Sequence, residues 1–205
     1  MEEKKMEIIK SALEVYMKFG IKSVTMDEMA RQLGVSKKTL YLYVRDKNEL
    51  VEQCLLYGHD CDMEMMDGIC GGNLNAIEEL LEIYRYLFKI LGSIHPSIFF
   101  DLSKYHPSAL KLMNNHKNET IRERVVVNLE KGMKEGLYRD NLNPGIVSRL
   151  HMGTIDMILS GEIIPFTEFK LEEVFSEFFR YDVRGIASNK GLESLKELIR
   201  NDENL

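Results

Sequence analysis

The chain has 205 residues, enough for one large domain or for a small domain followed by a larger one, and its formal net charge is -6. No apolar run approaches the roughly 18 to 20 residues that cross a bilayer, and the N-terminal MEEKKMEIIK lacks the apolar core of a signal peptide. These features exclude a membrane-spanning protein and predict a cytoplasmic one.

The charge is unevenly distributed along the chain. Residues 1–57 contain 10 basic and 9 acidic residues, a net charge of +1, so the remainder carries -7. Between Arg31 and Lys47, five basic residues stand against one acid. A locally positive segment in an acidic protein favours an anionic partner for that segment alone.

Helical spacing of apolar residues predicts an all-α protein of about nine helices, because the four prolines are few and little of the sequence alternates as strands do. The first helix is expected from Lys4 to Gly20. Its apolar stripe comprises Met6, Ile9, Ala12, Leu13, Tyr16 and Phe19.

A short second helix is predicted to begin at Met26. Thr25 and Glu28 have the spacing of a capping box, in which the threonine hydroxyl accepts a helix N–H and the glutamate bonds back to the cap. Gly34 is expected to end this helix in a left-handed conformation, and Ser36 is expected to cap the next one.

The third predicted helix carries Lys37 and Lys38 in its first turn, where the helix dipole favours acids. A polyanion lying across this helix end would explain the placement. Two short helices joined by a glycine turn are a helix-turn-helix arrangement, so the segment predicts binding to double-stranded DNA.

The remaining helices follow in chain order. Asp46 and Glu49 are expected to cap a long helix from about Lys47 to about Cys70. Asn143-Pro144-Gly145 is expected to form a turn. Further helices are predicted at 77–91, from His95-Pro96 through Leu102, from Pro107 to Gly136, and at 146–161, 171–186 and 192–199.

Residues Gly20 to Leu50 resemble the signature of the TetR family of bacterial transcriptional regulators. The resemblance rests on a threonine opening the second helix, Met29-Ala30 within it, Gly34-Val35-Ser36 in the turn, then Thr39-Leu40-Tyr41, Tyr43 and Lys47. Val44 departs from it, because many members have phenylalanine there. The rest of the chain matches only in length and helix order. The resemblance implies a three-helix DNA-binding domain at 1–47 and a ligand-binding and dimerisation domain at 48–205.

The resemblance also implies which residues contact DNA. Leu40 and Val44, four residues apart, should face the core, which leaves Lys37, Lys38 and Tyr41 to contact base edges. The alternative is that the lysines form a solvated face and the tyrosines are core aromatics. The complete predicted set, including phosphate contacts and the cap, is Thr25, Ser36, Lys37, Lys38, Thr39, Tyr41, Tyr43 and Lys47.

For the rest of the chain, the resemblance implies a homodimer formed by the helices at about 146–161 and 171–186. Two DNA-binding domains would then meet successive major grooves of a near-palindromic operator, about 34 to 36 Å apart. Either this interface or the core of one protomer could use the apolar side chains of Met152, Ile155, Leu159, Val174, Phe175, Phe178 and Phe179.

The resemblance further implies a pocket for an unidentified small-molecule effector. Methionines adapt to varied shapes and aromatics bury flat ligands, although filling of the core is the alternative for each. The candidates are Met63, Met66, Phe88, Phe99, Phe100, Tyr105, Met113 and Met152. Possible polar contacts are His95, His106, His116, His151 and Asp156.

No cofactor or metal is predicted, because no metal-binding spacing such as HExxH is present. Cys54, Cys61 and Cys70 form no CxxC pair and are expected to be buried reduced thiols. The alternative is a thiol sensor or a metal site that includes His59 and Cys61.

These features predict a ligand-responsive regulator, a repressor released by an inducer, and not an enzyme. The sequence has no nucleotide-binding glycine loop, nucleophile elbow or zinc signature. Two alternatives stay open: a helical small-molecule carrier, and a DNA-binding regulator that has no small-molecule ligand.

Overall fold

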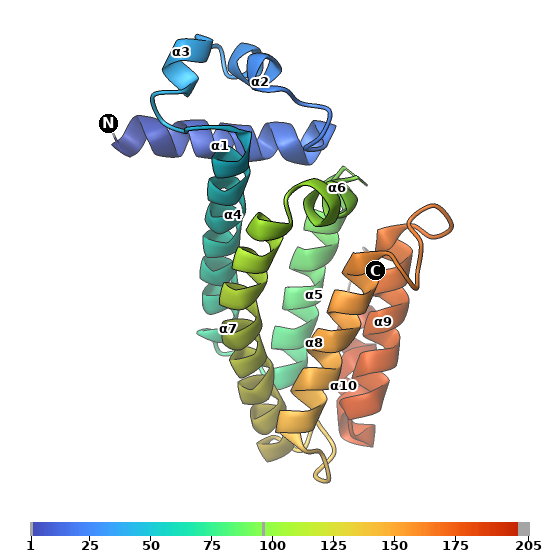
Figure 1. Ribbon diagram of the computed structural model, residues 1–205. Coiled ribbons are helices and arrows are strands. Elements are labelled where there is room, and N and C mark those ends of the chain that lie inside the picture. Colours follow the sequence, from blue (N-terminus) through green and yellow to red (C-terminus); the bar gives the residue numbers. More distant parts are fainter. Residues whose placement is uncertain (1, 96, 201–205) are drawn as a thin grey trace. The chain divides into compact units, whose positions relative to one another are not determined.

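The computed structural model describes residues 2–95 and 97–200, apart from the side chains of 112–119, and these ranges are all-α (Figure 1). The prediction of an all-α protein is confirmed, with ten helices in the described ranges where about nine were expected. They are α1 (Glu2–Phe19), α2 (Met26–Gln32), α3 (Lys37–Leu40), α4 (Lys47–Cys70), α5 (Ala76–Ser93), α6 (Ile98–Tyr105), α7 (Pro107–Lys134), α8 (Pro144–Ser160), α9 (Leu171–Ile186) and α10 (Asn189–Arg200).

The chain forms two compact units. Unit 1 comprises Met1–Glu64 and Ser93–Lys117, and unit 2 comprises Met65–Gly92 and Asn118–Leu205. Unit 1 therefore contains α1, α2, α3 and α6, whereas α4 and α7 each contribute residues to both units and α5 belongs to unit 2 except for Ser93. None of the described helices has the combination of length and apolar character that a membrane crossing requires.

The core of unit 1 gathers residues from α1 to α4 and from α6. Leu40 and Val44 are buried in it, as their spacing predicted, together with Leu50 at the start of α4. The predicted stripe of α1 was partly wrong, because Met6 and Phe19 are exposed while Ile8 is buried. Packing along α1 therefore follows Ile8, Ile9, Ala12 and Tyr16.

Two predicted helix starts differ from the structure. Helix α6 begins at Ile98 and not at His95-Pro96, since the His95 carbonyl accepts the Ile98 N–H in a preceding turn (3.0 Å); Pro96 lies outside the described residues. Asn143-Pro144-Gly145 is not a separate turn. The Asn143 side chain accepts the Ile146 N–H at 3.1 Å, so these residues form the cap and first turn of α8.

Unit 2 has its own core, in which α5 packs with α8 and α9. The rings of Tyr84 and Phe179 lie 4.3 Å apart between centroids, and Phe178 packs near both Tyr84 and Phe175. A polar contact also links two of these helices: His151 Nδ1 of α8 lies 3.0 Å from a carboxylate oxygen of Asp182 on α9. Aromatic burial and this polar contact together join α8 to α9.

Candidate DNA-binding site

The site is built from α2, α3 and the glycine turn between them (Figure 1). Gly34 takes a φ of +65°, and the following Val35 N–H donates to the Ala30 carbonyl at 3.0 Å, which closes the C-terminus of α2. The Ser36 hydroxyl accepts the Thr39 N–H at 3.0 Å and opens α3. The chain therefore turns sharply between two short helices.

The predicted capping box of α2 is only half formed. Thr25 Oγ1 accepts the Glu28 N–H at 3.2 Å, as expected. The Glu28 carboxylate does not return to the cap, because it accepts hydrogen bonds from Arg31 at 2.5 Å and Gln32 at 2.8 Å. Partners one turn further along α2 thus compete successfully for this side chain.

Five predicted DNA contacts are exposed: Thr25 at the N-cap of α2, and Ser36, Lys37, Lys38 and Tyr41 in α3 or at its ends. Lys37 Nζ lies 2.6 Å from a carboxylate oxygen of Asp27 on α2. Donation of a hydrogen bond to this carboxylate raises the pKa of Lys37, so the side chain carries its positive charge where α2 and α3 meet. Because Leu40 and Val44 are buried, the opposite side of α3 is left open.

The other three predicted contacts are half-buried. The Thr39 hydroxyl lies 2.7 Å from the Ser36 hydroxyl, and Tyr43 packs against the core of unit 1. Lys47 Nζ donates to the Ile21 carbonyl at 2.6 Å, and burial lowers the pKa of this lysine. The structure therefore does not present these three side chains to solvent as it presents the first five.

Leu42 was missed by the sequence analysis. It is 73% exposed, in the turn that follows α3 and next to Tyr41. An exposed leucine next to Tyr41 suits contact with an apolar group such as a thymine methyl. Its spacing of four residues from Lys38 would have placed it on the exposed side.

The predicted pocket residues belong to both units. Unit 1 contains Met63, Phe99, Phe100 and Tyr105, of which Phe100 and Tyr105 are exposed and pack edge to face with centroids 6.4 Å apart. Unit 2 contains Met66, Phe88 and Met152; the two methionines are buried. The side chains of Met113 and His116 lie outside the described residues.

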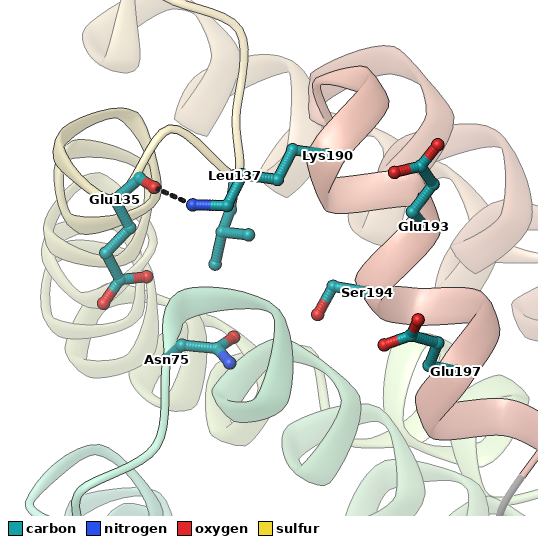
Figure 2. Close-up of a pocket in the computed structure, with 7 residues that line it drawn as sticks. All are labelled: Asn75, Glu135, Leu137, Lys190, Glu193, Ser194 and Glu197. Atoms are coloured by element: carbon teal, nitrogen blue, oxygen red, sulfur yellow. Dashed lines mark hydrogen bonds between the residues drawn. The ribbon is translucent and has the colours of Figure 1, made fainter.

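Unit 2 carries a surface depression of about 580 Å³. Figure 2 shows its lining, with Lys190 Nζ donating to the Glu135 carbonyl at 3.0 Å. The lining residues are Asn75, Glu135, Leu137, Lys190, Glu193, Ser194 and Glu197. None of the described pocket candidates is among them, and a polar, acidic lining does not suit an apolar effector.

The next features are the potential metal ligands and the cysteines in the part of the chain that the structure describes. No group of three or more His, Cys, Asp or Glu side chains there is arranged to hold a metal ion. The three cysteines are free thiols; Cys54 is buried, whereas Cys61 and Cys70 are partly exposed. Burial raises the pKa of Cys54, which makes its thiolate scarce.

A short helix, a glycine turn and a second short helix whose exposed side carries two lysines define a helix-turn-helix protein. Residues 8–54 match the family model described as bacterial regulatory proteins, tetR family. The chain belongs to the TetR family and is a transcriptional regulator.

Several known proteins are similar to this chain over most of their length. The chain is 25% identical to an uncharacterized HTH-type transcriptional regulator, YvaF of Bacillus subtilis, over 82% of this chain and 88% of the relative. It is 23% identical to the fatty acid metabolism regulator protein of the same organism, over 89% and 95%. The crystal structure of FadR from Bacillus subtilis in complex with stearoyl-CoA has the same fold, with a TM-score of 0.66 and 21% identity over 88% of this chain and 98% of that one.

Proposed function

We propose that the protein is a cytoplasmic, ligand-responsive repressor that binds a near-palindromic operator as a homodimer and releases it when a small-molecule effector binds. The observation that carries the proposal is the exposed side of α3, where Lys37, Lys38 and Tyr41 are accessible while Leu40 and Val44 are buried. In this proposal residues 1–47 bind DNA, and residues 48–205 provide the dimer interface and the effector site.

Base contacts are tested by comparing two DNA duplexes. An operator selected from genomic DNA and a scrambled duplex of equal length are titrated with Lys37→Ala, Tyr41→Ala and the control Lys10→Ala, which removes an exposed lysine of α1. Loss of a base contact should cost about 1 to 3 kcal/mol on the operator alone. Equal losses on both duplexes would remove Lys37 from the base contacts.

The exposed sides of α8 and α9 support dimerisation. Ile146 and Leu150 on α8 and Tyr181 on α9 are exposed by 58%, 66% and 80%. At Gly153 and Gly185, an added Cβ would meet no described atom within 4 Å beyond its chain neighbours and the backbone of its own helix, so both helices offer room for a close partner. We assign these sides to a second copy of the chain, because the spacing of Ile146, Leu150 and Gly153 keeps them on one side of α8.

Four of the apolar residues considered for the interface belong elsewhere. Met152, Phe175, Phe178 and Phe179 are buried within unit 2, so they fill the protomer core. Substitution of Leu150→Glu should therefore produce a folded monomer in analytical ultracentrifugation and abolish cooperative operator binding. The control Ile163→Glu, at a residue exposed by 71% outside α8 and α9, should remain dimeric.

The effector is proposed by analogy with the relatives. Because one is a fatty acid metabolism regulator and a similar fold binds stearoyl-CoA, we propose a long-chain acyl thioester. Such a ligand can release DNA only if it binds the DNA-incompetent state more tightly. Stearoyl-CoA should release operator in a fluorescence anisotropy titration, while coenzyme A and stearate separately should not. Retention of operator at saturating stearoyl-CoA would favour a regulator without this ligand.

The carrier alternative predicts a different result. A small-molecule carrier would bind an apolar ligand but show no salt-dependent affinity for DNA, whereas a helix-turn-helix regulator must lose affinity as salt rises. Titration of the selected operator at two or more salt concentrations separates the two functions.

A further inference from the structure

A single peptide group in unit 1 is held from both sides by charged residues. The carbonyl of Ile21 accepts a hydrogen bond from Lys47 Nζ at 2.6 Å, and the N–H of Lys22 donates to Asp101 Oδ2 at 2.8 Å. Because these two groups belong to the same peptide bond, the cation contacts its negative end and the anion contacts its positive end. We call this arrangement the peptide clamp: Lys47, the Ile21–Lys22 peptide and Asp101.

The peptide clamp gives a buried carboxylate the partners it needs. Asp101 is only 3% exposed, and besides the Lys22 N–H it accepts the Ser97 hydroxyl at 3.1 Å. An ionised carboxylate in such surroundings is costly unless it is hydrogen-bonded and close to a positive charge. Burial lowers the pKa of Lys47, and the charge of Asp101 opposes that shift.

His106 does not supply that positive charge. It is buried at the C-terminal end of α6, and burial, followed by the nearby charge of Lys47, lowers its pKa. The imidazole is therefore neutral at pH 7. Lys47 interacts electrostatically with both Asp101 and His106, and the Lys22 ammonium also interacts with Asp101.

The clamped peptide lies in the loop that leads into α2, three residues before its cap, Thr25. Two further contacts join the end of α1 and this loop to the segment around α6, which lies near the C-terminal end of α1 (Figure 1). The His95 N–H donates to the Met17 carbonyl at 2.7 Å, and Lys22 Nζ donates to the Tyr105 hydroxyl at 2.8 Å. The start of α4 and α6 thus hold the loop from two different elements.

We infer that Lys47 and Asp101 are positioning residues for DNA binding: through the Ile21–Lys22 peptide they fix the start of α2. Lys47 then acts within the protein and is not a phosphate contact, in contrast to the role that the family resemblance implies. The inference rests on the proposed function, since α2 and α3 are taken to bind DNA. Loosening the clamp lowers the fraction of molecules in the binding-competent geometry and so lowers apparent affinity.

Salt dependence distinguishes the two roles of Lys47. Each lost phosphate contact reduces the slope of log affinity against log salt by about 0.9. Operator binding is measured across a salt series for Lys47→Met, Asp101→Asn and the double variant, with Lys10→Met and Asp60→Asn as controls at exposed positions. Lys47→Met and Asp101→Asn should each weaken binding about tenfold, the scale of one charged hydrogen bond, without changing the slope.

The double variant and the controls complete the test. Because both residues hold one peptide, the double variant should bind within about twofold of the weaker single variant. Asp60→Asn should bind like the unaltered protein. A slope reduced by about 0.9 in Lys47→Met, or losses that simply multiply in the double variant, would overturn the inference.

A measurement without DNA tests the peptide clamp independently of the proposed function. Hydrogen exchange of the Lys22 amide should accelerate at least about tenfold in both Lys47→Met and Asp101→Asn, because its hydrogen bond opens more often. Unchanged exchange in either variant would refute the peptide clamp even if DNA binding is confirmed. Accelerated exchange in a protein that binds no DNA would support the clamp and reject the proposed function.

Discussion

Gly20 offers a quantitative test of how closely α1 and the segment before α6 approach each other. Its φ is +80°, a left-handed conformation that costs an alanine about 1 to 2 kcal/mol. An added Cβ would also lie 2.6 Å from Ser97 Oγ and 3.2 Å from His95 Nδ1. Overpacking of this kind adds about 1 to 3 kcal/mol, so Gly20→Ala should destabilise unit 1 by about 2 to 5 kcal/mol.

Gly34 provides the matched control. It has a φ of +65°, but no described atom would lie within 4 Å of an added Cβ, so Gly34→Ala should cost only the backbone contribution of about 1 to 2 kcal/mol. In a Ser97→Ala background, which removes the closest atom, the cost of Gly20→Ala should fall toward that of Gly34→Ala. Urea-dependent hydrogen exchange of the buried Leu40 and Leu50 amides measures both costs.

Two outcomes would refute this reasoning. If Gly20→Ala costs no more than Gly34→Ala, the approach of Ser97 to Gly20 has no energetic consequence. If Ser97→Ala leaves the cost of Gly20→Ala unchanged, the additional destabilisation does not come from this contact.

Three further predictions follow from single side chains. Ser36→Ala removes the cap of α3 and should cost about 1 kcal/mol in urea denaturation, whereas Ser36→Asn should cost clearly less; equal costs would argue against the cap. Burial and the charge of Lys47 lower the pKa of His106 in the folded state, so protonation of this residue favours the unfolded chain. The stability that neutral His106 contributes is therefore present above pH 6.5 and is lost as pH falls through the folded-state pKa. His106→Gln should therefore flatten the decline of the urea midpoint below pH 6.5, and an unaltered decline would contradict this. In native protein, Ellman's reagent should modify Cys61 and Cys70 well before Cys54, and denaturation should equalise the three rates; rapid native modification of Cys54 would show that its site opens readily.

Local chemistry made the helices around the site predictable. Thr25, Ser36 and Asp46 each accept an N–H from the residue three positions later, and Gly34 turns the chain between α2 and α3. All of these interactions lie within a few residues of sequence, so a pattern can reveal them. Glu28 shows the limit of such reasoning, since two nearby partners compete with the predicted one.

The faces of the helices were harder to assign. Periodicity identified α8 and α9 as apolar, yet it did not separate Met152, which faces the protomer core, from Leu150, which is open to solvent. A helix with apolar residues on more than one side can bury any of them, and the choice depends on which neighbour packs there.

The helical class, the helix-turn-helix and the family could be predicted from the sequence, because caps, turns and apolar periodicity are encoded over a few neighbouring residues. The contacts of Lys47 depend instead on the packing of distant segments. Its partner carbonyl belongs to Ile21, 26 positions earlier, and Asp101 meets the adjoining Lys22 N–H across 79 positions. Hydrogen bonds over such separations arise from the packing of whole helices, and no local pattern specifies them.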